Sequence, residues 1–227
     1  MKSGPARKRG PRPRAKRAGT FHHGELREAL IRAAVAAVEK HGHESVSLRP
    51  LAERVGVTQP AVYRHFRDKG ALLAAVAERA WGELDAAMQE ARAGGSEPFD
   101  AMRRGGRAYV EWAHAHPNLL RLVSSRVPSE QRTAPLAPPP REHFHEGMAG
   151  LVPIDDPRLA DAFRVSWAFA HGLAVLVVER VFSLVETDEA RLAAAYDAID
   201  CYVEMLRARW PARALRAETT GPSVRED

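Results

Sequence analysis

The stretch from Ser47 to Lys69 contains the residues whose types and spacing are most informative. The turn Val55-Gly56-Val57-Thr58 divides it into two short amphipathic segments. A tight turn with glycine between two short helices is typical of the helix-turn-helix, whose second helix lies in the major groove of DNA. Spacing alone leaves the function open, because glycine between short helices is common in all-α proteins. The outward side chains of the second segment can hydrogen-bond bases or phosphates; they are Thr58, Gln59, Tyr63 and Arg64.

These residues also resemble the pattern of the TetR family of bacterial transcriptional regulators. That pattern has Ala/Val-Gly-Val, then Ser/Thr, then Tyr-x-His-Phe-x-x-Lys-x-x-Leu. This chain has Val55-Gly56-Val57-Thr58, then Tyr63-Arg64-His65-Phe66, Lys69 and Leu72. The resemblance is strong over about residues 21–80. Further along, His116-Pro117-Asn118-Leu119 and Trp167-Ala168-Phe169-Ala170-His171-Gly172 look like a subgroup whose C-terminal domain has a Trp-His-Gly signature.

The resemblance implies a homodimer that places one recognition helix per subunit in successive major grooves of a palindromic operator. It implies that Thr58, Tyr63 and His65 contact DNA, and that Ser47 and Lys69 bind phosphates. Gln59 and Arg64 match variable positions where operator specificity is usually set, and Arg49 is a further candidate contact. The resemblance also implies that a fourth helix links the DNA-binding and ligand-binding domains.

Positive charge is concentrated at the start of the chain. The 227 residues have a formal net charge of +5 and a pI near 9.7. Residues 1–17 hold eight Lys and Arg and no acid, whereas residues 81–227 hold 22 acidic against 17 basic residues. Residues 1–19 also lack apolar side chains that could build a core, so we expect a disordered basic arm. Such an arm either contacts DNA or is a solvated tail.

The remaining periodicity is helical almost everywhere, which predicts an all-α fold. We expect an N-terminal three-helix DNA-binding domain over residues 20–67, a larger helical ligand-binding and dimerisation domain over 68–210, and a flexible tail over 211–227. Helices are expected over 23–41, 48–55, 59–66, 98–114, 142–151, 157–184 and 188–210. A further long helix is expected from the cap Asp68 to Gly94-Gly95, and a short one is expected after Pro117. Residues 127–140 contain five prolines and predict a loop.

An apolar ligand pocket could be built from the large side chains of the second domain, together with His171 on the most apolar helix. Most of these residues will be ordinary core. Two His-x-His pairs, at 114/116 and 143/145, face different ways on a helix, so we expect no metal site and no cofactor. The pocket candidates are Met102, Tyr109, Trp112, Phe144, Met148, Phe163, Trp167 and His171.

The last two helices carry more apolar surface than a lone helix pair can cover, which predicts a four-helix dimer interface. Cys201 lies on the last helix, and a small buried hydrophobe is favoured for it over a redox sensor. The expected interface residues are Phe163, Ala170, Ala174, Val178, Leu192, Ala195, Ile199, Tyr202 and Leu206.

The sequence therefore predicts a ligand-responsive repressor that is not an enzyme, binds double-stranded DNA as a dimer and is released by a small molecule. Two alternatives remain open: a non-specific nucleoid-type DNA binder driven by the arm, and a helical enzyme with a His-based site. Deleting residues 1–19 separates the operator-specific repressor from the nucleoid-type binder, because only an arm-driven binder would lose nearly all of its affinity for DNA. The most apolar run, Trp167 to Val178, is shorter than the about 20 residues of a membrane span, and we expect a bacterial cytoplasmic protein.

Overall fold

The computed structural model describes residues 23–125, 157–181 and 187–209, and every regular element in them is a helix. This confirms the predicted all-α fold. In chain order the elements are α1 (His23–His41), the 3-10 turn η1 (His43–Ser45), α2 (Leu48–Val55), α3 (Gln59–Tyr63), α4 (Lys69–Ala93), α5 (Pro98–Ala115), α6 (Pro117–Ser124), α8 (Pro157–Val178) and α9 (Asp188–Arg209).

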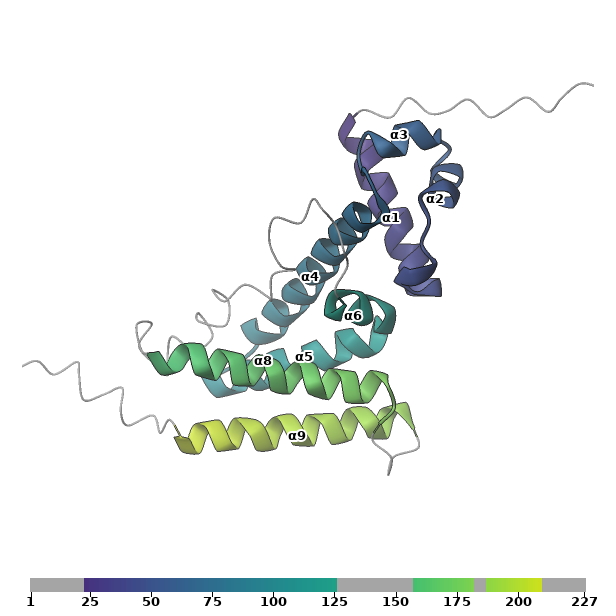
Figure 1. The fold of residues 1–227 in the computed structure, drawn as a ribbon. Helices are drawn as coiled ribbons and strands as arrows, with labels where there is room; N and C mark the ends of the chain where they lie inside the picture. Colours follow the sequence, from purple (N-terminus) through teal and green to yellow (C-terminus); the bar gives the residue numbers. More distant parts are fainter. Residues whose placement is uncertain (1–22, 126–156, 182–186, 210–227) are drawn as a thin grey trace, which may run out of the picture.

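The molecule has two parts joined by one long helix (Figure 1). Helices α1 to α3 form a small head, and α5, α6, α8 and α9 form a larger body. The head is held together by apolar side chains that are nearly or fully buried, among them Leu30, Val62 and Phe66. Burial of each such side chain contributes about 1.5–3 kcal/mol, so the head has a real core despite its size.

Helix α4 connects the head to the body. Its start is fixed by Asp68, whose carboxylate accepts a hydrogen bond from the Ala71 amide at 2.6 Å, as an N-cap residue does. Every fourth residue from there is buried, which makes one apolar stripe along the helix; these residues are Leu72, Val76, Ala80, Leu84 and Met88. Twenty-five helical residues span about 37 Å, so a single rigid rod reaches from the head to the far side of the body.

Helix α5 lies in the centre of the body, against α4, α8 and α9. Two arginines on α5 pair with carboxylates on α9. Arg107 reaches Asp200 at 2.7 Å, and Arg103 reaches Glu204 at 3.2 Å. Because these pairs are partly exposed, each contributes at most about 1 kcal/mol, and they fix how α5 and α9 align more than they stabilise the body.

Helix α8 ends earlier than the sequence predicts. The expected end was residue 184, but the helix ends at Val178, and Arg180 adopts a left-handed φ of 56°. A left-handed residue cannot continue a right-handed helix. Val181 is consequently outside the helix and 55% exposed. The predicted arm, the loop over 127–140, the short helix over 142–151 and the tail lie outside the described residues.

One segment of α8, Ala160–Val178, is long and apolar enough to cross a membrane by length and composition. It is longer than the 12-residue run noted in the sequence, because Asp161 and Arg164 are the only charges added before Trp167. A core helix of a soluble protein has the same composition. Only 28% of the segment is fully buried within the chain, and the rest of this apolar helix is half-buried or exposed.

Candidate functional site

The turn between α2 and α3 is fixed by the backbone of Gly56. This residue adopts φ 77° and ψ 30°, a left-handed conformation that favours glycine. Its amide and that of Val57 both bond to carbonyls at the end of α2, with Val57 reaching the Ala52 oxygen at 2.9 Å. These two bonds close the end of α2 and set the direction in which α3 leaves.

Helix α3 is anchored on one face and open on the other. Ala61 and Val62 are buried against the head, and Phe66 follows them into the same core. Thr58, Gln59, Tyr63 and Arg64 are all exposed, and the Tyr63 side chain is 48% exposed. A large aromatic residue held outward by a buried neighbour is suited to contact a partner rather than the protein core. The predicted outward face of the recognition helix is therefore the face that the structure exposes.

The other predicted DNA contacts lie before and on α2, after α3 and at the start of α4. Ser47 precedes α2 and is exposed, and Arg49 on α2 is exposed and pairs with Glu53 at 3.4 Å. His65 is half-buried. The Lys69 ammonium donates to the backbone carbonyl of Glu44 at 2.5 Å, which ties the start of α4 to η1. Because an ammonium has three donors, this bond leaves Lys69 able to contact a phosphate as well.

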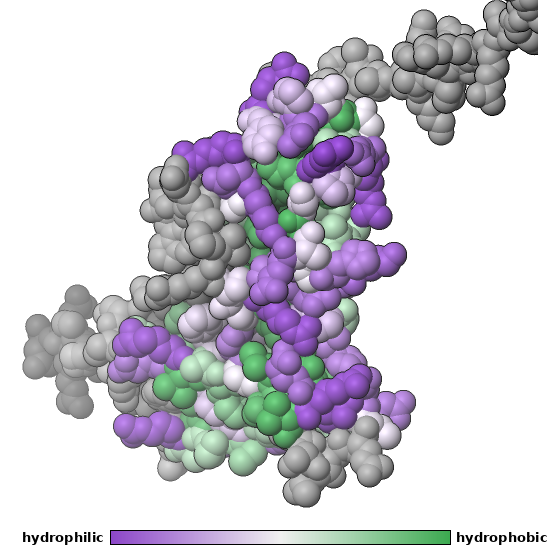
Figure 2. Space-filling view, turned by 45° about the vertical axis from the view of Figure 1, so that its right-hand side comes forward, coloured by the Kyte–Doolittle hydropathy of each residue, from purple (hydrophilic) through white to green (hydrophobic). Residues whose placement is uncertain are grey.

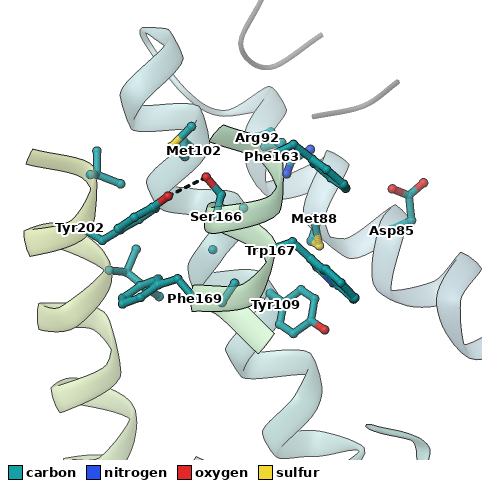
Figure 3. Close-up of a pocket in the computed structure, with 15 residues that line it drawn as sticks. Asp85, Met88, Arg92, Met102, Tyr109, Phe163, Ser166, Trp167, Phe169 and Tyr202 are labelled. Atoms are coloured by element: carbon teal, nitrogen blue, oxygen red, sulfur yellow. Dashed lines mark hydrogen bonds between the residues drawn. The ribbon is translucent and has the colours of Figure 1, made fainter. Parts of the chain in front are cut away.

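The body encloses a cavity of about 70 Å³ between α4, α5, α8 and α9 (Figure 3). Aromatic and aliphatic side chains dominate its lining. Four predicted pocket residues line it, namely Met102, Tyr109, Phe163 and Trp167. Ligand pockets commonly measure about 300–1,000 Å³, so a ligand would have to enlarge this one. The remaining lining residues are Asp85, Met88, Arg92, Gly105, Gly106, Ser166, Phe169, Ala170, Ile199, Tyr202 and Val203.

Sequence reasoning missed the contribution of α4 to this cavity. It treated the helix as a linker, although Met88 and Arg92 sit on it at i and i+4, a spacing that places two residues on one helix face. It also missed Gly105 and Gly106, where two successive glycines interrupt an otherwise strong helical pattern. That interruption was the available signal, because glycine inside a helix often marks a close approach by another group.

Two predicted pocket residues lie elsewhere. Trp112 is buried against the His116 ring, with ring centroids 5.2 Å apart, so it is core. His171 lies behind the cavity wall, where its Nδ1 contacts the Tyr109 hydroxyl at 2.9 Å and its Nε2 contacts the Ser124 hydroxyl at 3.3 Å. Burial lowers the pKa of His171. Phe144 and Met148 lie outside the described residues.

The Tyr109 hydroxyl lies 2.9 Å from the His171 Nδ1 and also has the Trp167 indole as a neighbour. Burial raises the pKa of Tyr109, and the neighbouring Trp167 indole lowers it by less. The phenol therefore stays neutral in the physiological range. A neutral phenol and a neutral imidazole form one hydrogen bond with either partner as donor, which satisfies both groups in a half-buried position.

Helix α6 joins the head to the polar cluster formed by Tyr109, His171 and Ser124. Its Ser124 lies next to His171 on α8, while its other end contacts the last turns of α1. There the Asn118 amide donates to the Glu39 carbonyl at 2.8 Å, and the His116 ring contacts the Glu39 carboxylate at 2.7 Å. The cavity wall and the head are thus connected by a second element besides α4.

Burial within the chain bears on the predicted dimer interface, which stays a prediction. Most of its residues are buried within the single chain, so they offer little surface to a second copy. Side chains on α8 and α9 that face α5 and one another form this stripe, for example Phe169 stacked on Tyr202 at 4.4 Å. Ala170, Val178 and Leu192 are half-buried. The fully buried members are Phe163, Ala174, Ala195, Ile199, Tyr202 and Leu206.

A different stripe of α8 is exposed. It contains Val165, Ala168, Gly172 and Leu176, spaced by three or four residues on one helix face, and Val165 is 56% exposed. On α9 the exposed apolar residue is Met205, and Cys201 is exposed rather than buried as predicted. Figure 2 shows apolar surface gathered low in the view, at the height of α8 and α9. Among the described residues no group of three or more His, Cys, Asp or Glu could hold a metal ion.

Sequence comparison places the head and the body in the same family. Residues 30–76 match the family model "Bacterial regulatory proteins, tetR family", and residues 102–199 match "Tetracyclin repressor-like, C-terminal domain". The class C tetracycline repressor of Escherichia coli is 54% identical over 52 residues, which are 23% of this chain and 24% of that protein. The repressor KstR of Mycobacterium tuberculosis is 31% identical over 78 residues, 34% of this chain and 36% of that one. The matched segments thus span only about a quarter to a third of these relatives.

Solved structures match over most of the chain. A protein of unknown function from Rhodococcus sp. RHA1 has a TM-score of 0.63 at 29% identity, over 80% of this chain and 96% of that one. A TetR-family transcriptional regulator from Pectobacterium atrosepticum has a TM-score of 0.59 at 25% identity, over 83% and 95%. A TetR variant from Acinetobacter baumannii in complex with minocycline shares the fold, with a TM-score of 0.59 at 21% identity, over 84% and 99%. With both segments matched and the whole fold shared, this chain belongs to the TetR family.

Proposed function

We propose that this protein is a ligand-responsive DNA-binding transcriptional regulator that acts as a repressor. The observation that carries the proposal is the exposed face of α3, which is held outward by the buried Val62 and Phe66 and oriented by the left-handed Gly56. The tetracycline repressors and KstR support it as relatives of the head. Tyr63 and Lys69 then supply DNA contacts, and Gln59 and Arg64 discriminate between operators.

The proposed active species is a cytoplasmic homodimer that uses the exposed stripe of α8, with α9 beside it. Support comes from α8, an apolar helix that its own chain buries only in part. Ala168 and Gly172 are small residues one helical turn apart, which lets two α8 helices approach closely. Two-fold symmetry would bring α8 and α9 of each copy into a four-helix bundle.

The effector binds in the body cavity and acts on the head by two routes. Enlarging the cavity moves Met88 and Arg92, and the rigid α4 carries this movement to Lys69. Displacing Tyr109 or His171 moves Ser124, and α6 carries that movement to Glu39. Either shift changes the separation of the two recognition helices, which must match one DNA turn of about 34–36 Å.

Selection of genomic fragments on the immobilised full-length protein tests this function. We expect the recovered fragments to share a palindrome whose half-sites lie about one helical turn apart. Mobility shifts with that palindrome and with its scrambled version then measure specificity. Fragments without a shared sequence, or equal affinity for both DNAs, would contradict an operator-specific regulator.

A further inference from the structure

The cavity contains one cation. Among the described residues that line it, Arg92 alone is basic, and its side chain is half-buried on the last turns of α4. Burial lowers the pKa of Arg92, and the attraction of Asp85 offsets this only in part. A guanidinium that has lost part of its hydration binds an anion more strongly than a guanidinium in water does.

Gly105 provides the space in which Arg92 lies. A Cβ atom at position 105 would come within 2.5 Å of the Arg92 Nε and 3.1 Å of its Cγ. Glycine weakens a helix interior, so its presence in the middle of α5 calls for a reason such as this close approach. The side chain of Arg92 crosses α5 at this point. Its position in the cavity wall is therefore set by two helices.

The rest of the lining suits a flat apolar group. Figure 3 shows Phe163 beside Arg92 and places Trp167 beside Met88, with Tyr109 nearby. The hydroxyls of this cavity already have partners, since Ser166 pairs with Tyr202 at 2.8 Å and Tyr109 pairs with His171. A ligand can consequently place apolar surface there without leaving these hydroxyls unsatisfied.

Asp85 is the acidic residue of the lining and the competing anchor. Its carboxylate accepts a hydrogen bond from the Gln89 amide at 2.8 Å. In Figure 3 it lies at the edge of the lining side chains, away from Tyr202 and Phe169, whereas Arg92 lies next to Phe163. A cationic ligand among the aromatic rings would therefore be repelled by Arg92 at short range.

We propose that the cavity binds a flat aromatic carboxylate, with the carboxylate on Arg92 and the ring among Phe163, Trp167 and Met88. The planar fork of a guanidinium matches a carboxylate with two parallel hydrogen bonds. Aromatic lining favours a flat ring. Because the cavity is only about 70 Å³, we limit the proposal to ligands of one or two rings, for which flexible Met88 and Met102 make room. The proposal rests on the proposed function in taking this cavity as the effector site.

Calorimetric titration of the full-length protein with matched compounds tests this ligand class. The probes are benzoate and 2-naphthoate, their neutral amides, and 2-naphthylmethylammonium. We expect at least one acid to bind tenfold or more tightly than its amide. We expect the Arg92→Gln variant to bind acid and amide alike, while Arg104→Gln, which removes an exposed arginine of α5, keeps the preference.

A second variant covers the case in which Arg92→Gln does not fold. Gly105→Ala keeps the charge but pushes the Arg92 side chain from its place, so it too should lose the preference for acids. Its control is Gly82→Ala, where a Cβ meets nothing within 4 Å. Equal binding of acids and amides by the unmodified protein, no binding of any acid, or tightest binding of the ammonium compound would overturn the proposal.

These titrations contain no DNA, so their failure is distinct from failure of the proposed function. A protein that selects a palindrome but prefers the ammonium compound remains a regulator with a different effector class. In a protein that prefers the acid in an Arg92-dependent way and selects no palindrome, the ligand proposal survives and the regulatory function does not. In a regulator with this effector class, the preferred acid also weakens the operator complex, and the Arg92→Gln variant abolishes this effect.

Discussion

The head and the body present their candidate functional side chains in opposite ways. In the head, a short helix is fixed from behind by Val62 and Phe66, and the polar face points into solvent. In the body, the candidate side chains point inward to a cavity that is smaller than the usual ligand site. The exposed face of α3 can therefore meet a partner without rearrangement, whereas the body must rearrange before its cavity can accept a ligand. Under the proposed function, a signal from ligand to DNA originates in that difference.

Breaking the proposed dimer should cause the largest loss of operator affinity, although the change lies outside the head. Gly172→Gln adds a long side chain on the exposed stripe of α8, where a Cβ meets nothing within 4 Å inside the chain. We expect a folded monomer by light scattering and a loss of operator affinity of about 10²–10⁴-fold, because two linked half-sites bind far more tightly than one.

The control for this variant is Gly82→Gln on α4, where the added side chain also has open space and lies beside residues of α1 and α4. It should remain dimeric and bind the operator normally. A Gly172→Gln protein that stays dimeric would mean that the copies meet through another surface.

Removing one exposed side chain of the head should have the next largest effect. Tyr63→Ala deletes a 48% exposed ring and leaves the buried face of α3 intact. If Tyr63 contributes about 1.4 kcal/mol per subunit, within the range for one hydrogen bond, a dimer loses about a hundredfold in operator affinity. Mobility shifts measure the loss, and Glu90→Ala, on the exposed surface of α4, is the control. Unchanged affinity together with an unchanged melting temperature would remove Tyr63 from the interface.

How far the sequence predicted each part follows from the range of the interactions involved. The head was predictable because Gly56 and Asp68 act on their own neighbours in the chain, so helix ends and outward faces follow from local rules. The cavity was only half predictable, because its lining joins Met88 on α4 to Phe163 on α8, and no local pattern says which large side chains meet.

The burial of most expected interface residues within the chain was not predictable, for a related reason. The richest apolar stripe of α8 and α9 was assigned to a second copy, whereas that stripe packs on α5 of the same chain. Side-chain size does not separate the two stripes, because the exposed one includes Val165 and Leu176 and the buried one includes Ala174. Apolar content indicates which side chains tend to be buried, but it does not say whether the same chain or a second copy buries them.

The conformation of Gly56 should have a smaller effect, on stability rather than on contacts. Gly56→Ala places a Cβ in open space but at φ 77°, which costs about 1–2 kcal/mol. Gly82→Ala also places a Cβ in open space, but within a regular helix, where alanine stabilises by about 0.5–1 kcal/mol. Urea unfolding should therefore shift in opposite directions for these two variants. A shift in the same direction would show that the turn tolerates other backbone conformations.

The smallest expected effect concerns the body and its response to pH. Because burial lowers the pKa of His171 below its unfolded value, the unfolded chain takes up a proton before the native protein does. Stability from the neutral ring is complete above about pH 6.5 and is lost as the pH falls toward the folded pKa. We expect the melting temperature of the unmodified protein to fall, between pH 7.5 and 5.5, by about 2 °C more than that of His171→Gln. Equal falls in melting temperature would mean that protonated His171 is accommodated beside Tyr109. The contact between His171 and α6 would then not depend on a neutral imidazole.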